Sequence, residues 1–269
     1  MQKHLIARAT IVFVTATCLL LLLGRSQAAD ATSQAASSVH AAPKHSLPPE
    51  ARGDVLMAER QYVAAIKAYN EAPTHSAAIW NKMGMAWQHL FATGPAKQDY
   101  ERALRLKPRY PEAINNLGTI YYAEGNYKRA EKLYRRALKL MPHSATFYNN
   151  LGAAYFAQGN ARKGAKAYQA AFAINPAIFA RDSSQGIPEL GSAAQQARQN
   201  YCLAELFARA GMTDRAIEYL RRALDEGFSD HRQLMEDRAF ASIRKTPAFA
   251  QLVRQKNRRR AKPAAAGLP

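Results

Sequence analysis

The chain has 269 residues, 48% of them hydrophobic, with near-average glycine and proline contents, so a collagen-like or wholly disordered chain is excluded. The formal net charge of +18 favours anionic partners, such as nucleic acid, anionic lipid or sugar, or an acidic protein surface. The length fits one or two domains.

Residues 1–29 have the composition of an export signal. Lys3 and Arg8 precede an apolar run at 11–23, and small residues follow at 26–29. The run is shorter than the roughly 20 residues of a membrane span. We therefore predict a signal peptide over 1–29 and an exported protein, periplasmic or secreted. An uncleaved segment that anchors the protein to the inner membrane is the alternative.

Residues 30–49 are mostly small and polar, end in two prolines, and are predicted to form a flexible linker. Without the signal peptide the chain keeps a single cysteine, Cys202, which excludes an internal disulfide. We expect Cys202 to be a buried side chain, with a reactive or intermolecular thiol as the alternative.

An internal repeat of 34 residues covers the centre of the chain, in units 77–110, 111–144 and 145–178. Four residue types share the period: Gly84, Gly118 and Gly152; Tyr100, Tyr134 and Tyr168; Ala103, Ala137 and Ala171; Pro108, Pro142 and Pro176. A common period in four independent residue types indicates a repeat architecture.

Each unit resembles the tetratricopeptide repeat, whose pattern is Trp-x2-Leu-Gly-x2-Tyr, then Ala-x3-Phe, then Ala, then Pro. The first unit has Trp80, Met83, Gly84, Trp87, Ala96, Tyr100, Ala103 and Pro108 at these places. The third unit departs at Gly164, where alanine is usual. The resemblance implies an all-α fold, an α-solenoid with a right-handed superhelix built from helix-turn-helix units.

The repeated residues have physical roles in such units. A glycine within the first helix, despite a helix cost of roughly 1 kcal/mol, indicates close packing against the second helix. Gly125 and Gly159 fall at the turn between helices, where a left-handed residue ends a helix. The prolines end the second helices.

Weaker matches flank the three units. Residues 50–76 form a degenerate unit and 197–230 a further one, which gives about five units in all. Between the third unit and the last one, residues 179–196 are predicted to form an insert loop because their composition is typical of turns. Residues 231–256 are expected to form a helical cap and 257–269 a basic disordered tail.

Catalytic motifs are missing from the sequence. There is no phosphate-binding glycine loop and no His-Glu-x-x-His, and no two histidines have helical ligand spacing. A site within the 18-residue insert would have too few residues to form. We therefore expect no enzymatic activity, no cofactor and no metal.

The resemblance implies that the first helices line a concave groove for an extended peptide. The candidate groove residues are Asn81, Asn115, Asn116, Tyr122, Asn149, Asn150 and Phe156. The pairs 115/149 and 116/150 are 34 residues apart, similar to the asparagine ladder of O-linked N-acetylglucosamine transferase, and amides can read a peptide backbone. As the alternative to peptide binding, the asparagines would join neighbouring units and the two aromatics would belong to the core. The family's carboxylate clamp is absent as a set, so recognition of chaperone tails is not expected.

The second helices are basic, most clearly at Arg129, Lys132, Arg135, Arg136 and Lys139. They form either a solvated convex face or a surface for an anionic partner. We predict a scaffold or adaptor in the bacterial cell envelope that binds protein or peptide partners. The alternative is a basic, surface-associated protein that binds anionic envelope polymers or lipid through its convex face and tail. Nucleic acid is not expected as a partner of an exported protein.

Overall fold

A computed structural model describes residues 47–73, 76–179 and 192–261. The predicted signal peptide, the linker up to residue 46, residues 180–191 of the insert and the end of the tail lie outside the described residues. Within the described residues the fold is all-α. The first six helices are α2 (Pro49–Ala58), α3 (Tyr62–Asn70), α4 (Ala77–His89), α5 (Thr93–Leu106), α6 (Pro111–Ala123) and α7 (Tyr127–Leu140). Those that follow are α8 (Ala145–Ala157), α9 (Ala161–Ile174), η2 (Pro176–Phe179), α10 (Ala193–Arg209), α11 (Thr213–Asp225), α12 (His231–Glu236), η3 (Arg238–Phe240) and α13 (Pro247–Ala261).

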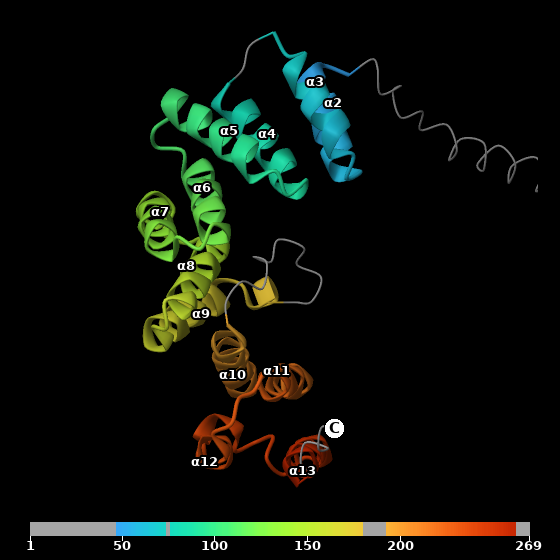
Figure 1. Ribbon diagram of the computed structural model, residues 1–269, viewed down its shortest axis with the longest axis vertical. Helices are drawn as coiled ribbons and strands as arrows, with labels where there is room; N and C mark the ends of the chain where they lie inside the picture. Colours follow the sequence, from blue (N-terminus) through green and yellow to red (C-terminus); the bar gives the residue numbers. More distant parts are fainter. Residues whose placement is uncertain (1–46, 74–75, 180–191, 262–269) are drawn as a thin grey trace, which may run out of the picture.

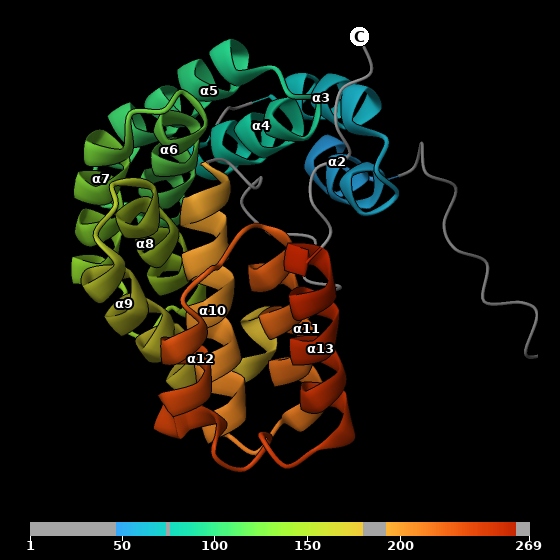
Figure 2. The same cartoon turned by 60° about the horizontal axis from the view of Figure 1, so that its bottom comes forward.

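The helices from α2 to α11 form five successive hairpins, each packed on the next, and together they curve into a solenoid (Figure 1). In Figure 2 the first helices α4, α6 and α8 lie inside the curve and the second helices α5, α7 and α9 outside it. The predicted α-solenoid is therefore confirmed, with the hairpins where the 34-residue period requires them.

A glycine against a tyrosine ring holds each of the first four hairpins together. A Cβ atom on Gly118 would lie 2.7 Å from Tyr134 Cε1, and one on Gly84 would lie 2.6 Å from Tyr100 Cε1. Gly53 and Gly152 contact Tyr69 and Tyr168 in the same way. These tyrosines are almost fully buried, so each ring occupies the space that the missing side chain leaves.

The fifth hairpin makes the equivalent contact between its two helices with different residues. Ala204 replaces the glycine and Leu220 the tyrosine, and both are fully buried. A leucine is narrower than a tyrosine ring, so the first helix can keep a methyl group here.

The turns between the paired helices use a residue in the left-handed region. Gly125, Gly159 and Gly211 have φ values of 75°, 76° and 74°. The two N-terminal turns have Arg60 at φ 60° and Phe91 at φ 58° instead. Side chains with a Cβ are strained in this region, so these two turns are exceptions to the rule that the other three follow.

The insert and the tail contain more helix than we predicted. Helix α10 begins at Ala193, where Ser192 and Gln195 form a reciprocal capping box, so the predicted insert loop ends four residues early. Helix α13 continues to Ala261, so residues 257–261 are helical and not part of a disordered tail.

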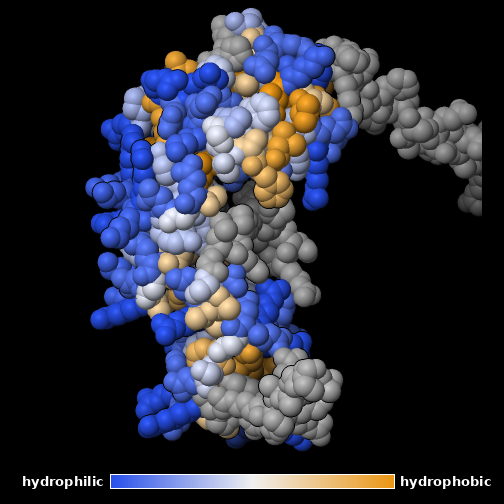
Figure 3. Space-filling view, viewed as in Figure 1, coloured by the Kyte–Doolittle hydropathy of each residue, from blue (hydrophilic) through white to orange (hydrophobic). Residues whose placement is uncertain are grey.

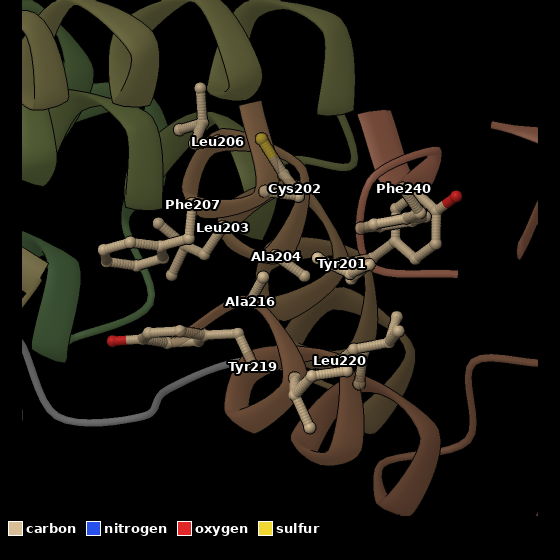
Figure 4. Packing of buried hydrophobic residues seen from close by; sticks show 14 of the residues in the cluster. Tyr201, Cys202, Leu203, Ala204, Leu206, Phe207, Ala216, Tyr219, Leu220 and Phe240 are labelled. Atoms are coloured by element: carbon tan, nitrogen blue, oxygen red, sulfur yellow. The ribbon is translucent and has the colours of Figure 1, made fainter. Parts of the chain in front are cut away.

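The last hairpin and the C-terminal helices share one hydrophobic core. Leu234, Phe240, Ile243, Phe249 and Leu252 pack with residues of α10 and α11. Figure 4 shows Phe207 stacked on Tyr219, with ring centroids 5.2 Å apart. The Cys202 thiol is buried in this cluster, as expected, and burial raises its pKa to about 12. In the described part of the chain, no helix has the length and apolar character to cross a membrane.

Candidate partner-binding surfaces

The inner asparagines form a chain of hydrogen bonds across three hairpins. Asn150 Nδ2 donates to Asn115 Oδ1 at 2.9 Å, and Asn116 Nδ2 donates to Asn81 Oδ1 at 3.1 Å. Within α6, Asn115 Nδ2 donates to Asn116 Oδ1 at 3.3 Å. The bonded partners in neighbouring units are thus 35 residues apart, and the pairs 34 residues apart that we predicted to stack are not hydrogen bonded to each other.

Most of these amides are buried between the first helices. Asn81, Asn115 and Asn150 are each exposed by 5% or less, while Asn116 and Asn149 are half-buried. The hydrogen bonds show that the four bonded amides join neighbouring units, which is the structural role that the sequence left open. Whether any of them also binds a peptide stays a prediction.

Two groups in α8 keep unused hydrogen-bonding capacity within the described residues. Asn149 makes no hydrogen bond there. Asn150 Oδ1 is buried and accepts none, although the Nδ2 of the same amide is bonded to α6. Since buried polar atoms are normally paired, this acceptor is exceptional. Sequence reasoning could not single it out, because Asn150 occupies the same place in its unit as Asn116.

The two candidate aromatics belong to the core. Tyr122 and Phe156 are each 3% exposed. The Phe156 ring fills the space at Gly164, where a Cβ atom would lie 2.6 Å from Phe156 Cδ2. Burial raises the pKa of Tyr122 to about 12. Their burial favours the alternative that both aromatics belong to the core over the prediction that they line the groove. For Phe156 the sequence holds a sign of this packing, because glycine replaces the usual alanine at position 164 and leaves room for the ring.

The basic residues that we predicted on α7 are exposed on the outer side of the curve. Arg129, Lys132, Arg135, Arg136 and Lys139 all reach solvent. Figure 3 shows hydrophilic residues over the outer side of α5, α7 and α9. Helix α7 has six cations and one carboxylate, that of Glu131, which lies 3.7 Å from Arg135 Nη1. Helix α9 has three cations and no acid. Positive charge therefore accumulates on this outer face.

Models of the tetratricopeptide repeat match three stretches of the sequence: a TPR repeat at 118–159 and tetratricopeptide repeats at 145–178 and 203–232. These stretches coincide with the hairpins from α6 to α11. The chain contains tetratricopeptide repeats. Tetratricopeptide repeats in general form scaffolds for interactions with other proteins, and this general role applies here.

Individual relatives of this chain are distant. The uncharacterized protein ycf37 of Pyropia yezoensis is 38% identical over 55 residues, which are 20% of this chain. The match spans 31% of the length of that relative.

Solved structures are similar over a larger part of the chain. The crystal structure of MamA is 21% identical and covers 65% of this chain and 93% of its own, with a TM-score of 0.45. The thermophilic TPR protein TTC0263 of Thermus thermophilus is 18% identical and covers 70% and 94%, with a TM-score of 0.47.

Proposed function

We propose that this protein is a scaffold or adaptor of the bacterial cell envelope that binds a short extended segment of a partner on the inner side of its curve. The role of tetratricopeptide repeat proteins in protein interactions supports the general part of the proposal. The sequence pattern of residues 1–29 supports export. N-terminal sequencing of the protein from fractionated cells tests export, and recovery of the intact chain from the cytoplasm would contradict it.

The observation that supports groove binding best is the unused amide capacity of α8. Asn150 Oδ1 is a buried acceptor without a donor, and the neighbouring Asn149 amide has no partner among the described residues. The half-buried Asn149 amide can accept from a backbone N–H of a bound segment and donate to its C=O, whereas Asn150 Oδ1 is too buried for a partner to reach. The amides of the two preceding hairpins bond to each other, so we expect the bound segment to be short.

The apolar character of the inner side adds to this. Apolar residues gather over α4 on the inside of the curve (Figure 3), and Met85 of α4 is 37% exposed. An unbranched thioether can adapt to partner side chains of different shapes. Backbone recognition at α8 with an adaptable contact at α4 suits a scaffold that accepts more than one partner.

Affinity capture from envelope extracts tests groove binding, with the immobilised protein as bait. We expect Asn149→Ala to lose the proteins that the wild type retains, because this amide contributes no hydrogen bond to the array. Lys139→Gln on the outer face is the control and should retain them. Unchanged capture by Asn149→Ala would contradict the groove as the binding site. Circular dichroism should show the same helix content for all three proteins.

A second candidate function rests on the charge of the outer face. The cations of α7 and α9 far exceed the carboxylates there, which favours binding of anionic envelope polymers or lipid. Charge reversal at Arg135 and Lys139 would then abolish capture, and added salt would weaken it. Capture that resists both changes would exclude this candidate.

A further inference from the structure

Phe91 is an exception to the turn chemistry of this array in two respects. It occupies the place that Gly125, Gly159 and Gly211 hold in later hairpins, and it adopts the same left-handed conformation at φ 58°. Its side chain is also 86% exposed. A phenylalanine is unfavourable in this conformation because of its Cβ, and its exposed ring gains nothing from folding. The fold therefore does not explain why phenylalanine stands here.

The turn before it has the same character. Arg60 lies at the corresponding place between α2 and α3, also left-handed, and is exposed. Its guanidinium is near the α4 turn, since burial and the charge of Arg60 lower the pKa of His89. Val63, at the start of α3, is 69% exposed. Two neighbouring turns thus present an aromatic ring, an aliphatic side chain and a cation to solvent.

The next two turns present cations. Lys128 and Arg129 follow Gly125, and Arg162 and Lys163 follow Gly159, and all four are exposed. None of them forms an ion pair within the described residues. They lie in the first turns of α7 and α9, where the helix dipole favours carboxylates over cations. The helix dipole therefore does not account for these four cations. Arg129 and Lys163 also lie over the rings of Tyr121 and Tyr155, at 4.1 Å and 5.4 Å from the ring centroids. This leaves Lys128 and Arg162 without a partner among the described residues.

All of these residues lie along one edge of the array. The hairpins repeat in the same orientation, so the turns within them follow one another along the same side of the solenoid. We call this side the turn edge, formed by Arg60, Val63, Phe91, Lys128, Arg129, Arg162 and Lys163. Its N-terminal part presents Phe91 and Val63 beside the charged Glu59 and Arg60. Its central part is mainly cationic, and the carboxylate of Glu124 there is paired with Lys97.

We propose that the turn edge docks on an anionic lipid bilayer, with Phe91 and Val63 inserted between the lipids and the cations against the headgroup phosphates. A bilayer needs no shaped pocket to accept an isolated, fully exposed ring. Mobile anionic headgroups can also neutralise cations spread over two hairpins without a fixed carboxylate opposite each one. A single protein partner would have to match both features along a curved edge. The proposal does not concern the inner groove, and of the predicted outer-face residues of α7 it uses only Arg129, which lies in the first turn of that helix. It stands whether or not the groove binds a peptide.

Titration of the full chain with lipid vesicles tests the proposal. One set contains phosphatidylcholine with phosphatidylglycerol, and the other phosphatidylcholine alone. Any contribution of residues 1–29 multiplies the partition coefficient of every variant equally, so ratios between variants report the turn edge. We expect Phe91→Gly to lower partitioning into the anionic vesicles about tenfold. It should also raise the melting temperature, because glycine relieves the strained turn.

Matched controls separate the edge from general apolarity and charge. Leu106 is 59% exposed at the other end of α5, and Leu106→Ser should partition within about twofold of the wild type. The pair Lys128→Gln and Arg162→Gln should reduce partitioning into anionic vesicles by more than about tenfold. The pair Arg135→Gln and Lys139→Gln removes the same charge from the outer face and should change it much less.

Three results would overturn the proposal. The first is wild-type partitioning by Phe91→Gly, and the second is an equal loss for Leu106→Ser. The third is equal partitioning of the wild type into both vesicle sets. The cations of the turn edge would then not bind anionic headgroups, and a protein would be the ligand of this edge. A groove variant such as Asn149→Ala should partition like the wild type, so failure of the groove proposal can be distinguished from failure of this one.

Discussion

Replacing Gly152 with alanine tests whether the hairpin glycines exist to admit a tyrosine ring. Glycine within a helix is less favourable than alanine by roughly 1 kcal/mol, so propensity alone predicts stabilisation. In the structure, the new Cβ would lie 2.3 Å from Tyr168 Cδ1 and 3.3 Å from the Gly164 carbonyl oxygen. Ordinary carbon–carbon contacts lie at about 3.5–4.0 Å, so the ring or the helix must move.

The ring has little room to move. Tyr168 is 1% exposed, and its ring lies 5.3 Å from that of Phe156 and 5.1 Å from that of Phe179, between centroids. Overpacking a tight core contact costs about 2–3 kcal/mol, near the upper end of its usual range. After the gain in helix propensity, we expect a net loss of about 1–2 kcal/mol. For a chain of this size that lowers the melting temperature by about 2–8 °C.

Thermal and urea unfolding followed by circular dichroism measure this loss. Gly94→Ala is the matched control, since a Cβ on Gly94 in α5 would meet no atom within 4 Å. Gly94 lies in the first turn of α5 directly before Pro95, which disfavours the helical conformation of a residue with a Cβ, so this change should alter the free energy of unfolding by no more than about 0.5 kcal/mol. The packing argument fails if Gly152→Ala is as stable as the wild type, or loses no more than the control.

Further predictions concern the core and the C-terminal cap. Ala137 is fully buried at a helix contact, so Ala137→Leu should lower the free energy of unfolding by about 1–3 kcal/mol, while exposed Lys139→Gln should leave the urea midpoint unchanged. Burial and the neighbouring Asp237 raise the pKa of Glu205 to about 8 from 4.5, so the folded state keeps a proton that the unfolded chain releases. Stability should therefore fall as the pH rises from about 4.5 to 8, and Glu205→Gln should flatten this dependence when urea midpoints are measured across that range. In a chain with Cys18→Ser, the Cys202 thiol should react with a chromogenic disulfide reagent only after denaturation, and rapid labelling of the folded protein would contradict its burial.

The sequence predicts the hairpins because the features that define them are local and periodic. Gly118 and Tyr134 recur every 34 residues in fixed positions, and their contact follows from two helices crossing within one unit. Asparagine contacts do not follow in the same way. A period identifies equivalent residues, but neighbouring units are rotated and shifted, so Asn150 meets Asn115 and not Asn116. The pairing of amides depends on this stagger, which no residue pattern records.

Two other features had signals that the repeat pattern obscured. Ser192 and Gln195 have the spacing of a capping box, but they fall in a stretch rich in turn residues, and the helix start was assigned to the next unit boundary. Residues 257–261 are strongly basic, which suggested a disordered tail. They extend a helix that begins at Pro247 and is already anchored by Phe249 and Leu252, and a helix propagates more easily than it nucleates.

The hydrophobic interior is divided into separate clusters along the array, and this division determines how the molecule would respond to tension. One cluster joins α2, α3 and α4, a second covers the central hairpins, and a third extends from Phe156 into the C-terminal helices. Each unit contacts mainly its neighbours, so a tension along the chain acts on all three clusters alike, and the first cluster, which has the fewest buried residues, should yield first. Such a chain extends in steps and refolds from the part that remains. The array would then lengthen by groups of hairpins under tension and shorten again when the tension is released.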